Sequence, residues 1–207
     1  MSAREAILAA LRRGDAAAPL PPIYAGSPRD SAIDLPSAFV QRAADVGAET
    51  HRIQSAALPS AIVAAVMEAG EREVVIWDDP LLDDSAGALR EAGITVLSGE
   101  AQTIETVAAC GFGITTVDHA IAETGTLVLG GGPGRSRAAS LLPAHHLAVL
   151  PEVRIRADLF DLMRDVRSPL PSSLTFITGP SRTADIGLTP VRPAHGPTTV
   201  TIFLVNR

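Results

Sequence analysis

Hydrophobic positions follow two different spacings between residues 37 and 97. In some stretches apolar residues recur every three to four positions, which is typical of helices that bury one face. Between them lie short, nearly continuous apolar runs, which are typical of strands covered on both faces. The spacing predicts helices over 37–47, 59–69 and 82–92 and strands over 50–54, 73–77 and 94–97. Because helices and strands alternate, we expect crossover connections and a mainly parallel sheet.

The second half of the chain contains more strand-like runs than helical spacing. Its candidates are strands over 112–117, 125–129, 147–150, 174–178 and 198–205 and a helix over 157–166. In the last strand apolar and polar positions alternate, which suits a sheet edge or a half-exposed position. We therefore predict an α/β fold with an open, mostly parallel sheet that is covered by helices.

The N-terminal region has a different pattern. A capping box at Ser2 predicts a helix that ends at Gly14. The apolar face of this helix holds Ile7, Leu8 and Leu11. Residues 15–36 then carry five prolines with little periodicity, which predicts an extended arm. We expect a helix and arm over 1–35 and one α/β domain over 36–207. The arm could pack on a partner subunit in a homo-oligomer, although a frayed terminus fits the sequence equally well.

Charge and hydropathy exclude several classes of partner. The 207-residue chain has a net charge of −6, no basic tract and only 3% aromatic residues. Nucleic-acid binding needs clustered positive charge, and an anionic membrane surface would repel this chain for the same reason. No apolar run approaches the roughly 18 residues of a membrane span, and the N-terminus does not resemble a signal peptide. We expect a cytoplasmic protein without membrane insertion.

Two features of the composition limit the chemistry. All 17 basic residues are arginine, so a lysine Schiff base and a lysine-bearing phosphate loop are excluded. An anionic ligand would have to be held by Arg, by backbone N–H groups or by hydroxyls. Cys110 is the single cysteine and lies in an apolar stretch, where a buried structural role is favoured over a catalytic one. One thiol can form neither a disulfide within the chain nor an iron–sulfur cluster, and we expect no bound cofactor or metal.

Three stretches rich in Gly, Thr and Ser adjoin predicted strand ends, namely residues 118–126, 130–137 and 178–186. Ligands of open α/β sheets bind in the crevice beyond the carboxyl ends of the strands. We therefore expect the three stretches to converge on one polar crevice.

The first stretch contains the candidate catalytic residue, Glu123. A carboxylate held at a turn among hydroxyls could act as a base, a nucleophile or a substrate anchor, or it could simply cap local backbone N–H groups. If this stretch were helical, His119 and Glu123 would share a face and form half a metal site. The sequence offers no further metal-ligand pattern, so a structural histidine is favoured.

The other two stretches supply candidate anion-binding groups. The Gly-rich loop 130–134 precedes two arginines and would let backbone N–H groups approach an anion, although a plain hairpin loop fits as well. Ser181 or Thr183 could cap a short helix whose N–H groups face an anion, or the turn could be purely local capping. His195 precedes a Gly-Pro turn and is a weaker catalytic candidate. The candidate substrate- and anion-binding residues are Thr124, Thr126, Gly131, Gly132, Arg135, Arg137, Ser181, Arg182, Thr183 and Asp185.

Five segments resemble the lactate utilisation protein C family, whose members are also called LUD-domain proteins. They are residues 113–115, 120–127 (AIAETGTL), 140–143, 177–186 (ITGPSRTADI) and 195–197, and the resemblance covers roughly residues 36–207. It implies a fold similar to the NagB/RpiA/CoA-transferase superfamily. It also implies a role beside two iron–sulfur partner proteins that oxidise L-lactate to pyruvate, and it makes Glu123 comparable with a CoA-transferase nucleophile.

Three hypotheses of function follow. The first is a non-redox component of an L-lactate oxidation system that partners iron–sulfur subunits. The second is a stand-alone CoA or acyl transferase, or a hydrolase, that uses Glu123. The third is a small-anion-binding module anchored by Arg135, Arg137 and Arg182. The sequence leaves the ligand and the oligomeric state open.

Overall fold

The computed structural model describes Arg4 and residues 34–99, 103–166, 171–184, 190–191 and 196–206. Its centre is a six-stranded sheet in the order β1-β12-β7-β4-β2-β3, in which every neighbouring pair is parallel. The strands are β1 Glu49–Gln54, β12 Thr199–Asn206, β7 His145–Pro151, β4 Phe112–Thr116, β2 Glu73–Ile76 and β3 Thr95–Leu97. The predicted α/β fold with a mainly parallel sheet is confirmed.

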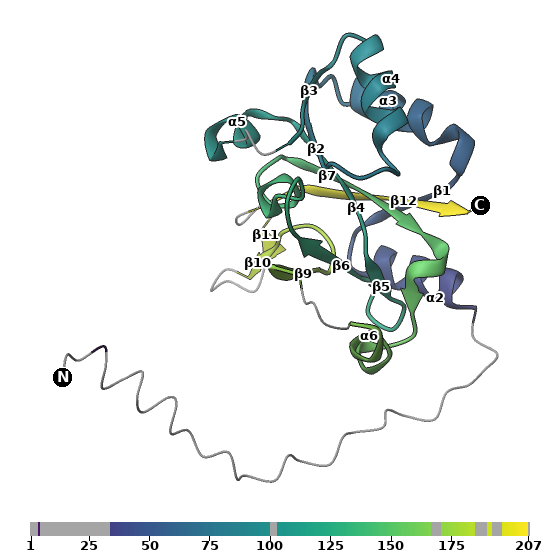
Figure 1. The fold of residues 1–207 in the computed structure, drawn as a ribbon. Helices are drawn as coiled ribbons and strands as arrows, with labels where there is room; N and C mark the ends of the chain where they lie inside the picture. The colour runs from purple at the N-terminus through teal and green to yellow at the C-terminus, as the bar shows by residue number, and fades with distance from the viewer. Residues whose placement is uncertain are drawn as a thin grey trace.

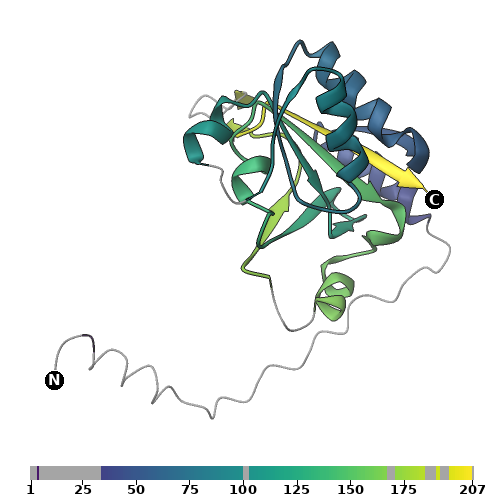
Figure 2. The ribbon, with the colours of Figure 1, turned by 45° about the horizontal axis from the view of Figure 1, so that its top comes forward.

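Helices cover both faces of this sheet (Figure 1). Helices α3 (Leu58–Glu68) and α4 (Asp83–Glu91) pack side by side on one face. Helix α2 (Leu35–Asp45) lies on the other face together with a second, smaller sheet, as both views show (Figure 2). The short helix α5 (Ile104–Ala109) connects β3 to β4. The arrangement has three layers, and the apolar core fills both interfaces.

The smaller sheet has the order β8-β5-β6-β9. It consists of β8 (Ile155–Arg156), β5 (His119–Ile121), β6 (Thr126–Gly131) and β9 (Ser173–Ile177). Strands β5 and β6 form an antiparallel hairpin, and β9 pairs antiparallel with β6. Helix α6 (Leu159–Asp165) packs on it through Leu162, which is buried with Ile121 and Val128. Beside these, β10 (Thr183–Ala184) and β11 (Pro190–Val191) form a two-stranded ladder.

Three short 3-10 helices connect the other elements, η1 (Ser55–Ala57), η2 (Arg137–Ser140) and η3 (Glu152–Arg154).

Gly113 of β4 lets η2 approach this strand closely. The carbonyl oxygen of Ala139 in η2 lies only 1.6 Å from the place that a Cβ on Gly113 would occupy. A residue larger than glycine would therefore push η2 off the sheet.

Most predicted elements of the main domain are confirmed to within a few residues, and several predictions are wrong. Strand β12 lies between β1 and β7 with Thr199 and Thr201 partly exposed, so of the two alternatives the half-exposed position holds and the sheet edge does not. Residues 183–184 form a strand instead of opening a helix. The stretch from His119 to Glu123 is a strand and turn, which removes the helical His–Glu pair. The sequence patterns did not reveal β5, β8 or α5.

Most of the predicted N-terminal helix and arm lies outside the described residues. Arg4 is helical, and Asp34 and Leu35 at the end of the predicted arm cap and begin α2. Among the described residues, no helix is both long enough and apolar enough to cross a bilayer.

Candidate functional site

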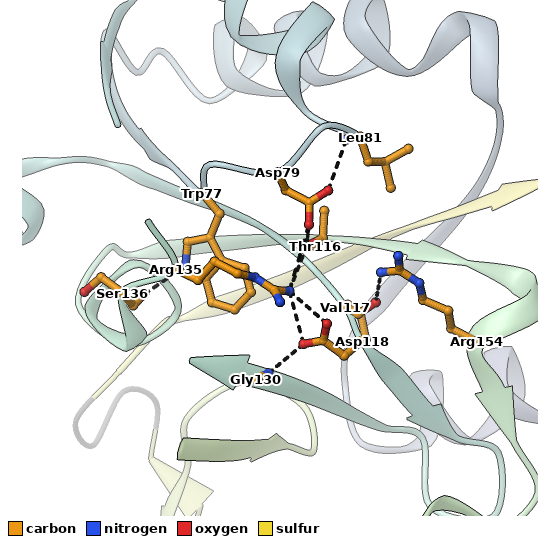
Figure 3. Close-up of polar contacts among 10 residues, drawn as sticks. All are labelled: Trp77, Asp79, Leu81, Thr116, Val117, Asp118, Gly130, Arg135, Ser136 and Arg154. Atoms are coloured by element: carbon orange, nitrogen blue, oxygen red, sulfur yellow. Dashed lines mark hydrogen bonds and ion pairs between the residues drawn. The ribbon is translucent and has the colours of Figure 1, made fainter. Parts of the chain in front are cut away.

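The carboxyl ends of β2 and β4 bring a cluster of polar side chains to one edge of the large sheet. Strand β2 continues into Trp77 and Asp79, while β4 ends at Thr116 and leads into Asp118. The two strands are direct parallel neighbours, so the residues that follow them emerge side by side. Figure 3 shows these side chains pointing toward the guanidinium of Arg135.

Arg135 reaches this edge from the tight turn that follows β6. Gly132 and Arg135 form an isolated antiparallel bridge, and Gly134 between them has a φ of 69°. The Gly134 carbonyl accepts a hydrogen bond from the backbone N–H of Asp78 at 3.0 Å, which fixes the turn against the end of β2. The glycine loop is therefore a structured hairpin turn that presents an arginine.

The Arg135 guanidinium is held on several sides. Its Nη2 donates to Thr116 Oγ1 at 3.1 Å and to the two Asp118 carboxylate oxygens at 3.0 and 3.1 Å. Its centre lies 4.5 Å from the ring centroid of Trp77, in a cation–π arrangement. The Trp77 indole N–H in turn donates to the Ser136 carbonyl at 2.8 Å. This packing fixes the arginine in one orientation.

The two carboxylates of the cluster are also tied to the backbone. Asp118 Oδ2 accepts the backbone N–H of Gly130 at 2.6 Å. Asp79 accepts the Leu81 N–H at 3.0 Å and the Thr116 hydroxyl at 2.8 Å, and it lies 4.0 Å from Arg135 Nη2. The cluster is preorganised by hydrogen bonds from three separate elements, β2, β4 and β6, together with the turns that follow them.

A cavity of about 380 Å³ opens beside this cluster. Its walls are Asp118, His119, Gly130, Arg135, Asp165, Val166, Pro171 and Leu174. The carboxylate of Asp165 is paired with Arg156, so its charge is largely compensated. Val166, Pro171 and Leu174 form an apolar side of the cavity, and the Asp118 carboxylate and the Arg135 guanidinium form a polar side. Small-molecule sites usually combine apolar walls with a few polar groups in this way.

His119 contributes a neutral ring to the cavity wall. Burial lowers the pKa of its imidazole, the positive charge of Arg156 lowers it further, and Asp118 acts in the opposite direction. Its Nδ1 is buried and makes no hydrogen bond to any residue the structure describes. A mostly neutral imidazole at pH 7 can donate or accept one hydrogen bond toward a ligand.

The Glu123 turn lies at the far end of the hairpin from this cavity. Glu123 is exposed in the turn between β5 and β6, and its backbone N–H donates to the Ala157 carbonyl at 3.0 Å. Strand β6 separates this turn from Gly132 and Arg135 by about 17 Å at the usual rise per residue. The structure therefore does not bring Glu123 to the arginine.

The Glu123 turn instead meets the start of the third stretch, beside α2. The hydroxyls of Thr124 and Thr126 lie 2.7 Å apart, and Thr126 is 2.8 Å from Thr178 Oγ1. The next residues after Thr178 reach the end of α2, where Arg182 donates to the Val46 carbonyl at 2.8 Å. This contact satisfies a carbonyl at the helix C-terminus.

The remaining predicted residues are spread over the molecule. Gly131 ends β6 and accepts hydrogen bonds from the Ser172 backbone and hydroxyl, and Arg137 opens η2 with an exposed side chain. The backbone N–H of Ser181 donates to the Pro197 carbonyl, next to the amino ends of β7 and β12. Thr183 is described by its backbone alone. Asp185 and His195 lie outside the described residues.

Three residues of the arginine cluster, Trp77, Asp79 and Thr116, were not among the predicted site residues, and Asp118 was predicted only as the first residue of the polar stretch 118–126. Their signal is position, because Asp78 and Asp79 follow the strand predicted over 73–77, and Thr116 and Asp118 lie at the end of the strand predicted over 112–117. Carboxyl ends of neighbouring parallel strands meet at one edge. The described residues contain no group of three or more His, Cys, Asp or Glu arranged to hold a metal ion.

The fold and this cavity define an α/β protein with a small polar pocket at the carboxyl ends of a parallel sheet. The chain belongs to the LUD domain family, whose model matches residues 37–205. It is 33% identical to lactate utilization protein C of Halalkalibacterium halodurans over 151 residues, which cover 68% of this chain and 65% of that protein. It is 27% identical to lactate utilization protein C of Shouchella clausii over 182 residues, which cover 84% and 80%.

A solved structure has the same fold. A DUF162 family protein from Deinococcus radiodurans matches with a TM-score of 0.59 at 23% identity, covering 83% of this chain and 96% of that one. This likeness supports the arrangement of layers and strands described above.

Proposed function

We propose that this chain is a non-redox component of a system that oxidises L-lactate to pyruvate, and that it works beside iron–sulfur subunits. Membership of the LUD domain family and the likeness to relatives named lactate utilization protein C support the role in lactate utilisation. The single cysteine supports a non-redox role for this chain, because an iron–sulfur cluster needs about four thiolates. The partners would therefore carry the redox centres.

We further propose that the Asp118–Arg135 pocket binds a small hydroxy- or oxo-carboxylate. The arrangement of Arg135 is the observation that carries this proposal. Only Nη2 of its guanidinium hydrogen bonds within the described part of the chain, and Nη1 remains available as a donor. A ligand carboxylate can accept from Nη1 while the ligand hydroxyl donates to Asp118. Because Asp118 already compensates Arg135, we expect weak binding, with a Kd of about 1 mM, or about −4 kcal/mol.

Deletion of the gene in the organism that encodes it tests the role in lactate utilisation. We expect loss of growth on L-lactate as sole carbon source and unchanged growth on pyruvate, because only the oxidation step is removed. The wild-type gene should restore growth, and Asp118→Asn should not restore it at equal protein level. Normal growth of the deletion strain on lactate would contradict the proposal.

Purification of the tagged chain from lactate-grown cells under anaerobic conditions tests the partnership separately. We expect co-purifying proteins that contain iron and acid-labile sulfide and show the visible absorbance of iron–sulfur clusters. The same purification from pyruvate-grown cells is the control. A chain that purifies alone under both conditions counts against stable iron–sulfur partners without affecting the growth result.

The alternative of a stand-alone transferase or hydrolase assigns the chemistry to Glu123. Its carboxylate makes no hydrogen bond or ion pair within the described ranges, and it projects from an exposed turn. Glu123→Gln therefore serves as the matched variant in the growth experiment. Restored growth with Glu123→Gln together with failure of Asp118→Asn favours the arginine pocket, and the reverse pattern favours the Glu123 alternative.

A further inference from the structure

A second hollow lies on the opposite face of the large sheet from α2. Helix α3 leaves a groove of about 540 Å³ over β1 and β12. The wall on α3 is a stripe of small side chains at Ala61, Ala64, Ala65 and Ala69. These positions repeat with helical spacing, so they form one face of α3. Alanines leave room for larger apolar side chains from another segment.

The floor of the groove combines aromatic and aliphatic side chains with Thr199 and Thr201, and its rim is acidic. Phe112 stacks on His145 with ring centroids 4.8 Å apart, and His51 meets the ring of Phe203 edge-on at 5.9 Å. The carboxylates of the rim are Glu49 at the start of β1 and Glu68 at the end of α3. No Arg is among the lining residues of this groove. Its surface therefore suits an apolar segment that carries positive charges at its border.

The described main domain begins close to this groove. Helix α2 starts at Leu35, and Ser37 in its first turn is hydrogen bonded to Arg52 of β1 at 3.4 Å. Strand β1 is an edge of the sheet, and His51 points to the opposite face from Arg52 because side chains alternate along a strand. The main domain therefore begins beside one face of the edge strand β1, and the groove lies over the other face of the same strand.

The segment that precedes residue 34 is long enough to reach across this edge. Residues 14–33 can span at most about 66–72 Å when extended, whereas packed layers are only about 10 Å apart. Before them lies the predicted helix over residues 2–13, with Ile7, Leu8 and Leu11 on one face and Arg12 and Arg13 at its end. Its apolar face matches the alanine wall, and its arginines match the acidic rim.

We propose that residues 2–13 bind in this groove of their own chain as an amphipathic helix, with Leu8 and Leu11 toward α3 and the arginines toward Glu49 and Glu68. Such binding covers the apolar side chains of the floor and the alanine face of α3. The proposal is independent of the role in lactate utilisation, and it concerns a surface away from the Asp118–Arg135 pocket.

Thiol labelling in the full-length chain tests this proposal. A thiol introduced by Ala64→Cys should react with a maleimide at least several-fold more slowly than the same thiol in a chain that also carries Leu8→Asp and Leu11→Asp. A thiol introduced by Ala108→Cys on exposed α5 is the matched control and should react equally in both backgrounds. Burial raises the pKa of the native Cys110 thiol, which keeps it from competing.

Each outcome of this experiment decides the proposal. Equal labelling of the Ala64→Cys thiol in both backgrounds overturns it. A difference in labelling rate between the two backgrounds that stays constant when the protein is diluted supports binding within one chain. A difference that disappears on dilution overturns the assignment to the same chain and places the helix of a second copy in the groove. Substitution of Glu49 and Glu68 by Gln should weaken the protection if the arginines contact the rim, and unchanged protection would contradict that part.

Discussion

The ion pair between Asp118 and Arg135 should contribute measurably to stability. The two side chains are 28% and 23% exposed, so the pair is partly buried. Fully exposed pairs contribute about 0–1 kcal/mol, whereas removing one partner of a fully buried pair costs about 3–5 kcal/mol. Asp118 also accepts the Gly130 N–H, and an Asn at this position would retain that contact. We expect Asp118→Asn to lower the free energy of unfolding by about 2 kcal/mol, or roughly 4–8 °C in Tm.

A double-mutant cycle measures the pair itself. Urea unfolding of the wild type, Asp118→Asn, Arg135→Gln and the double variant can be followed by circular dichroism and by the fluorescence of Trp77, the only tryptophan. We expect a coupling energy of about 1–2 kcal/mol, because the double variant leaves no uncompensated charge. Strict additivity of the two single losses would refute the reasoning, since it would mean that Asp118 and Arg135 do not stabilise each other.

Two further predictions concern the scaffold. In thermal unfolding, Gly113→Ala should lower the free energy of unfolding by about 3 kcal/mol or more, because the new Cβ would meet the Ala139 carbonyl. Gly87→Ala is the matched control in α4, where a Cβ would meet no atom within 4 Å. It should raise the free energy of unfolding by up to about 1 kcal/mol. Burial lowers the pKa of His146 to about 4, so the contribution of this neutral ring to the free energy of unfolding is full above pH 6.5 and falls by about 1.4 kcal/mol per pH unit between pH 6.5 and 4. His146→Gln should flatten that slope in denaturation measured over this pH range, and an identical slope would contradict the burial of a neutral ring.

The order of helices and strands could be predicted from the sequence because each core strand is covered on both sides. Val74, Val75 and Ile76 are essentially fully buried, and such a run is unmistakable. The alternating threonines of β12 left a sheet edge and a half-exposed position open, and the structure shows the second. Thr199 and Thr201 are only partly exposed, and they line the groove beneath α3. Alternation alone does not distinguish an edge strand from an inner strand that has one partly open face.

The candidate site was harder to predict because it depends on strand order. The Gly loop and Arg135 could be named as candidates from their chemistry, but the sequence does not show that β2 and β4 are neighbours and bring Asp79 and Asp118 to the same edge. The convergence of all three polar stretches also failed for a geometric reason. Strand β6 joins the Glu123 turn to the Gly loop as a straight element, so the two must lie at its opposite ends. The strand predicted over 125–129 already separates the two, so this part of the geometry could have been read from the sequence.

The most direct test of the arginine pocket is a titration of Trp77 fluorescence with L-lactate and pyruvate. Because the indole stacks on the Arg135 guanidinium, a carboxylate that binds this arginine should change the emission. We predict a saturable change in the wild type and in Glu123→Gln, and its loss in Arg135→Gln. A saturable change that survives in Arg135→Gln and disappears in Glu123→Gln would contradict the account and move the site to the hairpin turn.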